Sequence, residues 1–301
     1  MKFNGYKDMY LRHKKFFPKE ITQNFFYDSQ LAACVESRDS GKYNNLLLER
    51  EWIRAGRPYY NVFPKIIPHL LKVNENNVPV ESVQLPLRNL LLRFPENCPE
   101  LSFEFKGQTY YLKTALLGQH LEASYLPQHV ESILVYMDLG EIVDDDVVYT
   151  YQRIPLIPGM TIGKAVLTVV SDLFGVIAPT TFFDKVLKLI CTLCILSKDI
   201  DDAIVIPDLI NSDKKKLDSA SKSEIERLHA KAKRNGKFGW NVGEEIVVAP
   251  HVRSGSPLAL YWTGKGRTQM TYRPRKGCIV HRKIVNTLPT GYQSEPDLVT
   301  E

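Results

Sequence analysis

A period of two in hydrophobicity begins at residue 101, and it restricts the chain to folds that contain a β-sheet. Residues 101–105 alternate, residues 106–108 have the composition of a turn, and residues 109–113 alternate again, which predicts a β-hairpin. Residues 132–139 and 147–154 are predicted as two further strands. We therefore expect a central antiparallel sheet.

Helical periodicity flanks this sheet region on both sides. Apolar residues recur at intervals of three and four between residues 17 and 71, which predicts an N-terminal helical region interrupted by prolines. Thr161 has the position of an N-cap before an amphipathic run, and residues 180–197 form a second, largely apolar helical pattern. With 44% hydrophobic residues the chain has enough apolar surface to build a core, so the predicted class is α+β.

Four regions are expected along the chain. Residues 1–75 form the N-terminal helical region, and residues 76–210 form the central α+β body. Residues 211–240 are rich in charge and are predicted as a linker, an exposed loop or a solvated helix. Residues 241–301 contain short alternating segments separated by Gly and Pro, which predicts a small basic β unit.

Composition also restricts the cellular setting. The five cysteines are scattered and odd in number, and the first residues lack the apolar core of a signal peptide, so we expect a reduced, cytoplasmic protein. The most apolar stretch, residues 186–196, contains Lys188 and is far shorter than the ~20 residues that a membrane span needs, so no membrane association is expected.

The run from Ala249 to Lys283 contains eight lysines and arginines and no acidic residue, although the whole chain carries a formal charge of only +5. Aromatic residues are interleaved with these cations. Unpaired bases stack on aromatic rings while cations contact phosphates, so the pattern favours RNA as the partner, with no DNA predicted. The predicted RNA-binding residues are His251, Arg253, Tyr261, Trp262, Lys265, Arg267, Tyr272, Arg273, Arg275 and Lys276. The alternative is an ordinary basic sheet whose aromatic side chains pack inward.

Three further motifs have structural as well as functional explanations. The segment Gly264 to Arg267 lacks the longer loop, the Lys-Ser/Thr end and the following helix of a nucleotide-binding loop, so it is interpreted as a simple phosphate contact. His251 and His281 have the chemistry for acid–base catalysis of RNA cleavage, but a histidine beside a proline is usually structural. Cys191 and Cys194 have zinc-pair spacing but no nearby second pair, so we interpret them as core residues and expect no metal and no cofactor.

The tail carries a resemblance to a known family. Pro250, His251, Arg253 and Gly255 form a Pro-His-x-Arg-x-Gly segment, and a Tyr-Trp-x-Gly-x-Gly segment follows at Tyr261 to Gly266. This order resembles the type V-A anti-CRISPR family, found on phages and plasmids, whose members lower the level of their target nuclease. The family commonly has a second histidine where this chain has Ser256. This difference argues against catalysis by a pair of histidines.

The resemblance implies a regulator of host-defence evasion that recognises a nascent target polypeptide, such as a CRISPR effector nuclease, and causes loss of its mRNA. RNA or the ribosome would be a partner, in the cytoplasm of the bacterial host, and no catalytic residues are implied. Two other hypotheses remain. One is a stoichiometric protein-binding inhibitor that grips a peptide of its target without RNA. The other is a metal-dependent ribonuclease that uses the acidic group of Asp138, Glu141 and residues 144–146.

Overall fold

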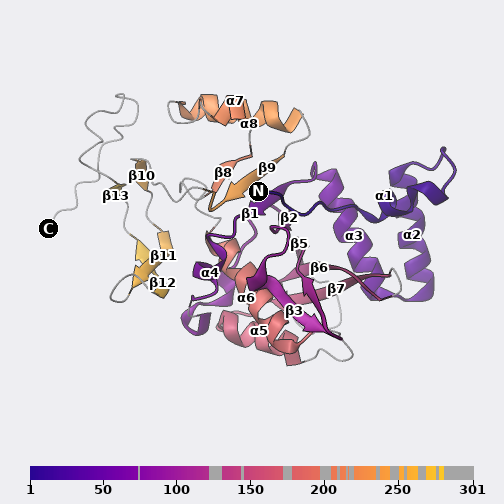
Figure 1. The fold of residues 1–301 in the computed structure, drawn as a ribbon, viewed down its shortest axis with the longest axis horizontal. Helices are drawn as coiled ribbons and strands as arrows, with labels where there is room; N and C mark the ends of the chain where they lie inside the picture. Colours follow the sequence, from indigo (N-terminus) through magenta and orange to yellow (C-terminus); the bar gives the residue numbers. More distant parts are fainter. Residues whose placement is uncertain are drawn as a thin grey trace.

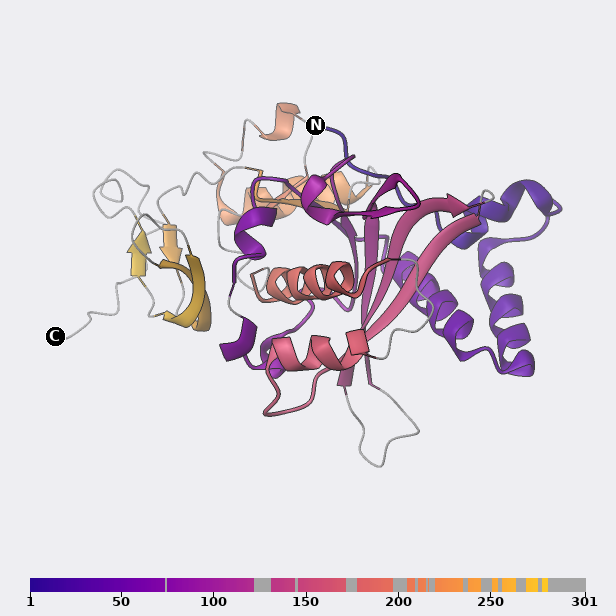
Figure 2. The ribbon, with the colours of Figure 1, turned by 60° about the horizontal axis from the view of Figure 1, so that its bottom comes forward.

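The computed structural model of the 301-residue chain places helices on both faces of a seven-stranded sheet (Figures 1 and 2). It describes residues 1–73, 75–121, 131–143, 146–171, 178–196, 205–208, 211–214, 216, 220–234, 238–244, 251–253, 256–263, 269–275 and 278–280. No helix in these ranges is both long enough and apolar enough to cross a membrane.

The central sheet has the strand order β7-β6-β5-β2-β1-β9-β8. The strands are β1 (Tyr59–Val62), β2 (Asn89–Arg93), β5 (Thr114–Leu121), β6 (Glu131–Val143), β7 (Asp146–Pro155), β8 (Val205–Pro207) and β9 (Gly239–Val242). The antiparallel prediction is correct for β2, β5, β6 and β7 and for the β8–β9 pair. However, β1 lies between β2 and β9 and is parallel to both, so the sheet is mixed.

Helices α5 (Ile162–Ser171) and α6 (Thr180–Leu196) cover one face of the sheet, as Figure 2 shows. The predicted N-cap is confirmed, because Thr161 Oγ1 accepts a hydrogen bond from the Lys164 N–H at 3.4 Å. Phe183, Ile190 and their apolar neighbours on α6 are fully buried against alternate residues of β5 and β6. This layer is the main core.

The N-terminal helices pack on the opposite face of the sheet. They are α1 (Met9–His13), the 3₁₀ turn η1 (Lys14–Phe16), α2 (Gln23–Ser37) and α3 (Ser40–Arg54). Leu48 and Trp52 of α3 contact Leu91, Leu116 and the neighbouring outward residues of β6. Side chains alternate between the faces of a strand, so consecutive residues of the sheet contact the two different cores. The body therefore has three layers: the N-terminal helices, the sheet, and helices α5 and α6.

Short elements complete the central body. The predicted hairpin is confirmed as β3 (Ser102–Phe105) and β4 (Gln108–Tyr111), and Lys106 and Gly107 both take positive φ values in its two-residue turn. Helix α4 (Ile67–Leu70) and the 3₁₀ turns η2 (Glu75–Asn77), η3 (Val80–Ser82) and η4 (Pro99–Leu101) lie in the connections.

The charged region after residue 204 contributes to the sheet. It contains α7 (Asn211–Lys214) and α8 (Lys222–Arg234), and β8 and β9 flank them. Leu228 and Ala232 are buried on one side of α8, while Glu226 and Arg227 are exposed. The boundary expected at residue 241 falls within β9, which is an inner strand of the central sheet.

Candidate functional site

The acid-free tail contains two small antiparallel sheets. One pairs β10 (His251–Arg253) with β13 (Cys278–Val280), and the other pairs β11 (Ser256–Thr263) with β12 (Gln269–Arg275). The β11–β12 hairpin lies beside α4 and α6 (Figure 2). Three of the ten predicted RNA-binding residues, Lys265, Arg267 and Lys276, lie outside the described residues.

The register of the hairpin assigns the predicted residues to two faces. Tyr261 is opposite Thr271, and Arg273 and Arg275 follow Thr271 at intervals of two. Residues directly opposite each other share a face, as do residues two apart in one strand. Tyr261, Arg273 and Arg275 therefore share one face of the hairpin. By the same rule Trp262 and Tyr272 share the other face, because Trp262 is opposite Met270.

In the second small sheet, His251 and Arg253 are two residues apart on β10 and so share a face. Their partners in the register are Val280 and Cys278. His281, the second histidine of the tail, lies outside the described residues.

A row of polar side chains, which sequence reasoning missed, lies across the parallel strands β1 and β9. Asn61 of β1 and Asn241 of β9 are opposite each other in the register and are buried. The Asn61 Nδ2 donates to Asn241 Oδ1 at 2.8 Å and to Asp208 Oδ2 at 3.3 Å. The Asn241 Nδ2 in turn donates to Glu244 Oε2 at 2.6 Å. The row therefore runs from one carboxylate to the other through two amides.

Tyr59 closes one end of this row. Its hydroxyl donates to Asp208 Oδ2 at 2.7 Å, and burial together with this carboxylate raises the pKa of Tyr59 well above its ordinary value. The ring crosses the strand at Gly239, where a Cβ atom would lie 2.3 Å from it. Only a glycine leaves room for this ring, so Gly239 positions Tyr59 over Asp208.

A repeated pattern in the sequence could have revealed the row. The strands Tyr-Tyr-Asn-Val at 59–62 and Gly-Trp-Asn-Val at 239–242 each place an asparagine between two apolar residues. A buried asparagine in a short apolar strand needs a hydrogen-bond partner, and a second strand with the same pattern can provide it. The two strands are far apart in the sequence, so local periodicity does not connect them.

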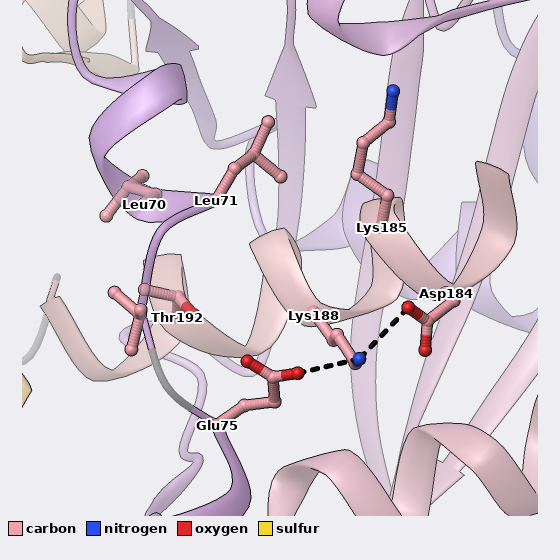
Figure 3. Close-up of a pocket in the computed structure, with 8 residues that line it drawn as sticks. Leu70, Leu71, Glu75, Asp184, Lys185, Lys188 and Thr192 are labelled. Atoms are coloured by element: carbon pink, nitrogen blue, oxygen red, sulfur yellow. Dashed lines mark ion pairs between the residues drawn. The ribbon is translucent and has the colours of Figure 1, made fainter. Parts of the chain in front are cut away.

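A small pocket lies between α4, η2 and α6 (Figure 3). Its volume is about 160 Å³, well below the ~300 Å³ lower end for sites of small-molecule ligands. The Lys188 Nζ lies in its wall, 2.7 Å from Glu75 Oε1 and 3.0 Å from Asp184 Oδ2. Burial alone would lower the pKa of Lys188, but these two carboxylates outweigh it and raise the pKa. The positive charge of Lys188 is thus balanced by two carboxylates of the pocket itself.

Other residues considered in the sequence have internal roles. Cys191 and Cys194 are buried on α6, as predicted, and burial raises the pKa of the Cys191 thiol to about 12. Asp138 is buried on β6, and its Oδ1 accepts a hydrogen bond from the Gly140 N–H at 2.8 Å. Residues 144 and 145 lie outside the described part of the chain.

The chain has a structural likeness among known proteins. No protein-family model matches the chain, and no curated protein matches its sequence. Among solved structures, the crystal structure of AcrVA2, a type V-A anti-CRISPR protein, matches with a TM-score of 0.48 and 17% sequence identity. The match covers 89% of this chain and 90% of that one. The chain is similar to AcrVA2.

Proposed function

We propose that the protein is an anti-CRISPR-like regulator that recognises a nascent target polypeptide and causes loss of its mRNA, with the basic tail engaging RNA or the ribosome. The observation that carries this proposal is the Pro-His-x-Arg-x-Gly and Tyr-Trp-x-Gly-x-Gly tail, which resembles that of the type V-A family. The target would be a protein such as a CRISPR effector nuclease, met in the cytoplasm of a bacterial host.

The backbone of the tail supports a role in RNA binding. An aromatic residue, Tyr261, shares a hairpin face with Arg273 and Arg275. Stacking of bases on aromatic rings is worth roughly 1–3 kcal/mol per base and tolerates any sequence, while arginines contact the phosphates. One face of the hairpin would thus bind single-stranded RNA without strong base preference. Recognition of the message would then come from the nascent polypeptide.

Affinity purification from translating bacterial cells, followed by sequencing of the bound RNA, tests the proposal. The test variant is R273A/R275A, and the matched control is R227A/R234A, which removes two exposed arginines from α8. We expect one message or ribosomal RNA to be enriched by the wild-type protein and the control but not by the test variant. Equal enrichment by all three proteins would refute the tail as the RNA surface.

The same purification distinguishes the main rival. A protein partner that stays bound after nuclease treatment, with no enriched RNA, would favour a stoichiometric inhibitor that grips a peptide of its target. Cleavage of RNA that disappears on addition of a chelator would instead favour a metal-dependent ribonuclease.

A further inference from the structure

A second basic surface lies at the opposite end of the molecule from the tail, on the N-terminal helices (Figure 1). Leu11 and Phe16 expose 45% and 73% of their surface. His13, Lys14, Lys15 and Lys19 are also exposed. We define these six residues of α1, η1 and the following turn as the N-terminal basic surface. No acidic residue occurs between Leu11 and Lys19.

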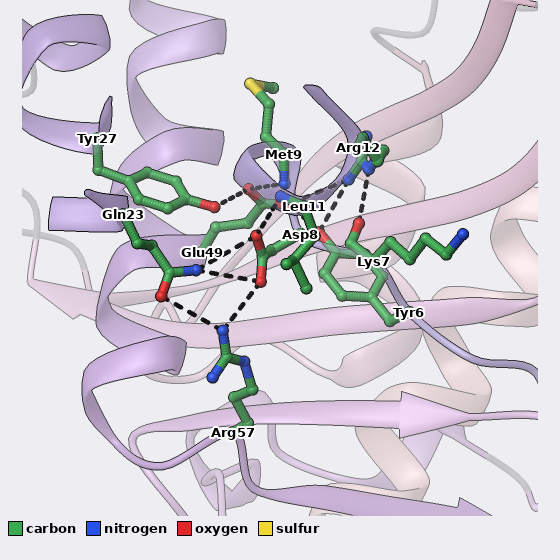
Figure 4. A network of polar contacts seen from close by, with 10 residues as sticks. All are labelled: Tyr6, Lys7, Asp8, Met9, Leu11, Arg12, Gln23, Tyr27, Glu49 and Arg57. Carbon is green, nitrogen blue, oxygen red and sulfur yellow. Dashed lines mark hydrogen bonds and ion pairs between the residues drawn. The ribbon is translucent and has the colours of Figure 1, made fainter. Parts of the chain in front are cut away.

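Two acidic residues beside this surface, Asp8 and Glu49, point into the protein (Figure 4), whereas Glu20, which follows Lys19, is exposed. Asp8 and Glu49 are each 1% exposed. Asp8 accepts hydrogen bonds from the Leu11 N–H at 3.0 Å and from Arg57 at 3.1 Å. Glu49 is bound by four donors that belong to Tyr6, Met9, Arg12 and Tyr27. Their negative charge is therefore used internally, and the lysines outside are not neutralised by them.

The exposed lysines retain their charge for a partner. Within the described ranges, Lys14, Lys15 and Lys19 form no ion pair with a protein carboxylate. Lys15 Nζ lies 4.8 Å from the centre of the Phe16 ring. Cations beside an exposed aromatic face are the combination that binds phosphates and unpaired bases together.

The surface is held in place before any partner arrives. The Met9 N–H donates to Glu49 Oε2 at 3.0 Å, which fixes the first turn of α1 to α3. On the far side of the exposed segment, the Phe17 ring packs against Phe26 of α2 at 5.2 Å between centroids. Little ordering is then needed on binding, so less of the interaction energy is lost.

We infer that the N-terminal basic surface is a second binding site for single-stranded RNA, in which Phe16 stacks on a base and Lys14 and Lys15 contact phosphates. This inference rests on the proposed function, because it assumes that the protein acts on RNA. With the tail at the other end of the body, one strand could be held at two points. Once one site has bound the strand, the effective concentration of RNA at the second site is raised.

An anionic membrane fits the surface less well than RNA does. A helix that lies in a membrane interface presents a continuous apolar face with cations on its polar side. Here α1 has only five residues, and the adjacent α2 exposes the acidic residues Asp28 and Glu36. The exposed apolar side chains of α2, Phe25 and Val35, thus lie on the same helix as exposed carboxylates, which an anionic membrane repels.

Fluorescence anisotropy with a labelled oligouridine of about 15 nucleotides, close to the site size of a single-strand-binding groove, tests the inference on the full chain. The test variant is K14A/K15A/F16A. The matched control is K106A/K164A/L167A, which removes two exposed lysines and one exposed apolar side chain from other parts of the protein. Circular dichroism of all variants checks that each is folded.

We expect the test variant to bind about tenfold more weakly at low salt, a loss that one stacked base alone can account for. The slope of log affinity against log salt should become shallower by about 1.4, since two phosphate contacts are lost at about 0.7 each for single strands. The control should retain the wild-type affinity and slope. An unchanged affinity in the test variant, or a lack of any RNA binding by the wild-type protein, would overturn the inference.

Parallel measurements separate this inference from the proposed function. If R273A/R275A lowers affinity and K14A/K15A/F16A does not, the inference is overturned and the tail remains the RNA surface. If the N-terminal variant alone lowers affinity, the inference is supported and the tail assignment is refuted. Loss of binding to phosphatidylserine vesicles in the N-terminal variant, with no RNA binding by the wild type, would overturn the inference in favour of a membrane surface.

Discussion

Substitution of Glu49 by alanine should destabilise the protein more than any surface change on the same helix. The Glu49 carboxylate is buried and accepts from Tyr27 Oη at 2.8 Å, from the Met9 N–H at 3.0 Å and from Arg12 Nη2 at 3.1 Å (Figure 4). The Tyr6 hydroxyl is a fourth donor. All four lose their acceptor when the carboxylate is removed.

The magnitude follows from the donors that water cannot reach. A buried donor left without an acceptor costs roughly 1–3 kcal/mol, and removing one partner of a buried ion pair costs roughly 3–5 kcal/mol. The Arg12 side chain is 16% exposed and can recover some hydration, so we take the lower part of that range. We expect Glu49→Ala to lower the free energy of unfolding by about 3 kcal/mol, or roughly 6–12 °C in Tm.

Urea unfolding followed by tryptophan fluorescence measures this loss. Glu51→Ala is the matched control, because Glu51 lies on the same helix and forms surface ion pairs with Arg50 and Arg54. Such pairs contribute about 0–1 kcal/mol. A Glu49→Ala variant as stable as the Glu51→Ala variant would refute the idea that Glu49 anchors the N-terminal segment.

Three further outcomes are expected. Gly239→Ala should cost about 1–3 kcal/mol of unfolding free energy in urea titrations, because the new Cβ meets the Tyr59 ring, and a variant of wild-type stability would contradict this geometry. Burial raises the pKa of Glu49 in the folded state, so the folded protein binds a proton more tightly than the unfolded chain. The free energy of unfolding of the wild type, relative to that of Glu49→Gln, should therefore fall as pH rises from about 4.3, the pKa in the unfolded chain, through the higher pKa of the folded protein. Urea titrations across that pH range measure this difference, and a difference independent of pH would contradict the shift. Cys191 and Cys194 should resist iodoacetamide in native buffer and react in urea, as mapped by mass spectrometry, because burial raises the pKa of both thiols; rapid native labelling would contradict their burial.

Much of the central body could be predicted because its signals are local. The β3–β4 hairpin, strands β6 and β7 and helices α5 and α6 occur where the residue periodicity predicted them. In the two helices one face contacts the core, and the spacing of the apolar residues shows which face it is. Strand β6 contacts a core on each face and is recognisable as a short apolar run. Thr161 could be recognised as a cap for the same reason, since its hydrogen bond reaches only three residues along the chain.

The parallel centre of the sheet could not be predicted in this way. Strands β1 and β9 have four residues each, too few to establish a period, and nothing local relates Asn61 to Asn241. The buried positions of Asp8 and Glu49 were likewise hidden, because a charged residue gives no sign in the sequence of the donors that will surround it. In the tail, the strand register divides the predicted RNA-binding residues between two faces of the hairpin. The RNA-binding role of the tail stays a prediction.

The location of β9 has a consequence for how the chain is made. Asn61 and Asn241 are neighbours in the sheet but are 180 positions apart in the sequence. A ribosome that adds about 5–20 residues per second needs roughly 10–40 s to cover that distance, and during this time one edge of β1 has no strand to pair with. An unpaired strand edge is a template for aggregation. Folding of this protein in the cell should therefore depend on chaperones that shield β1 until residue 242 has left the exit tunnel.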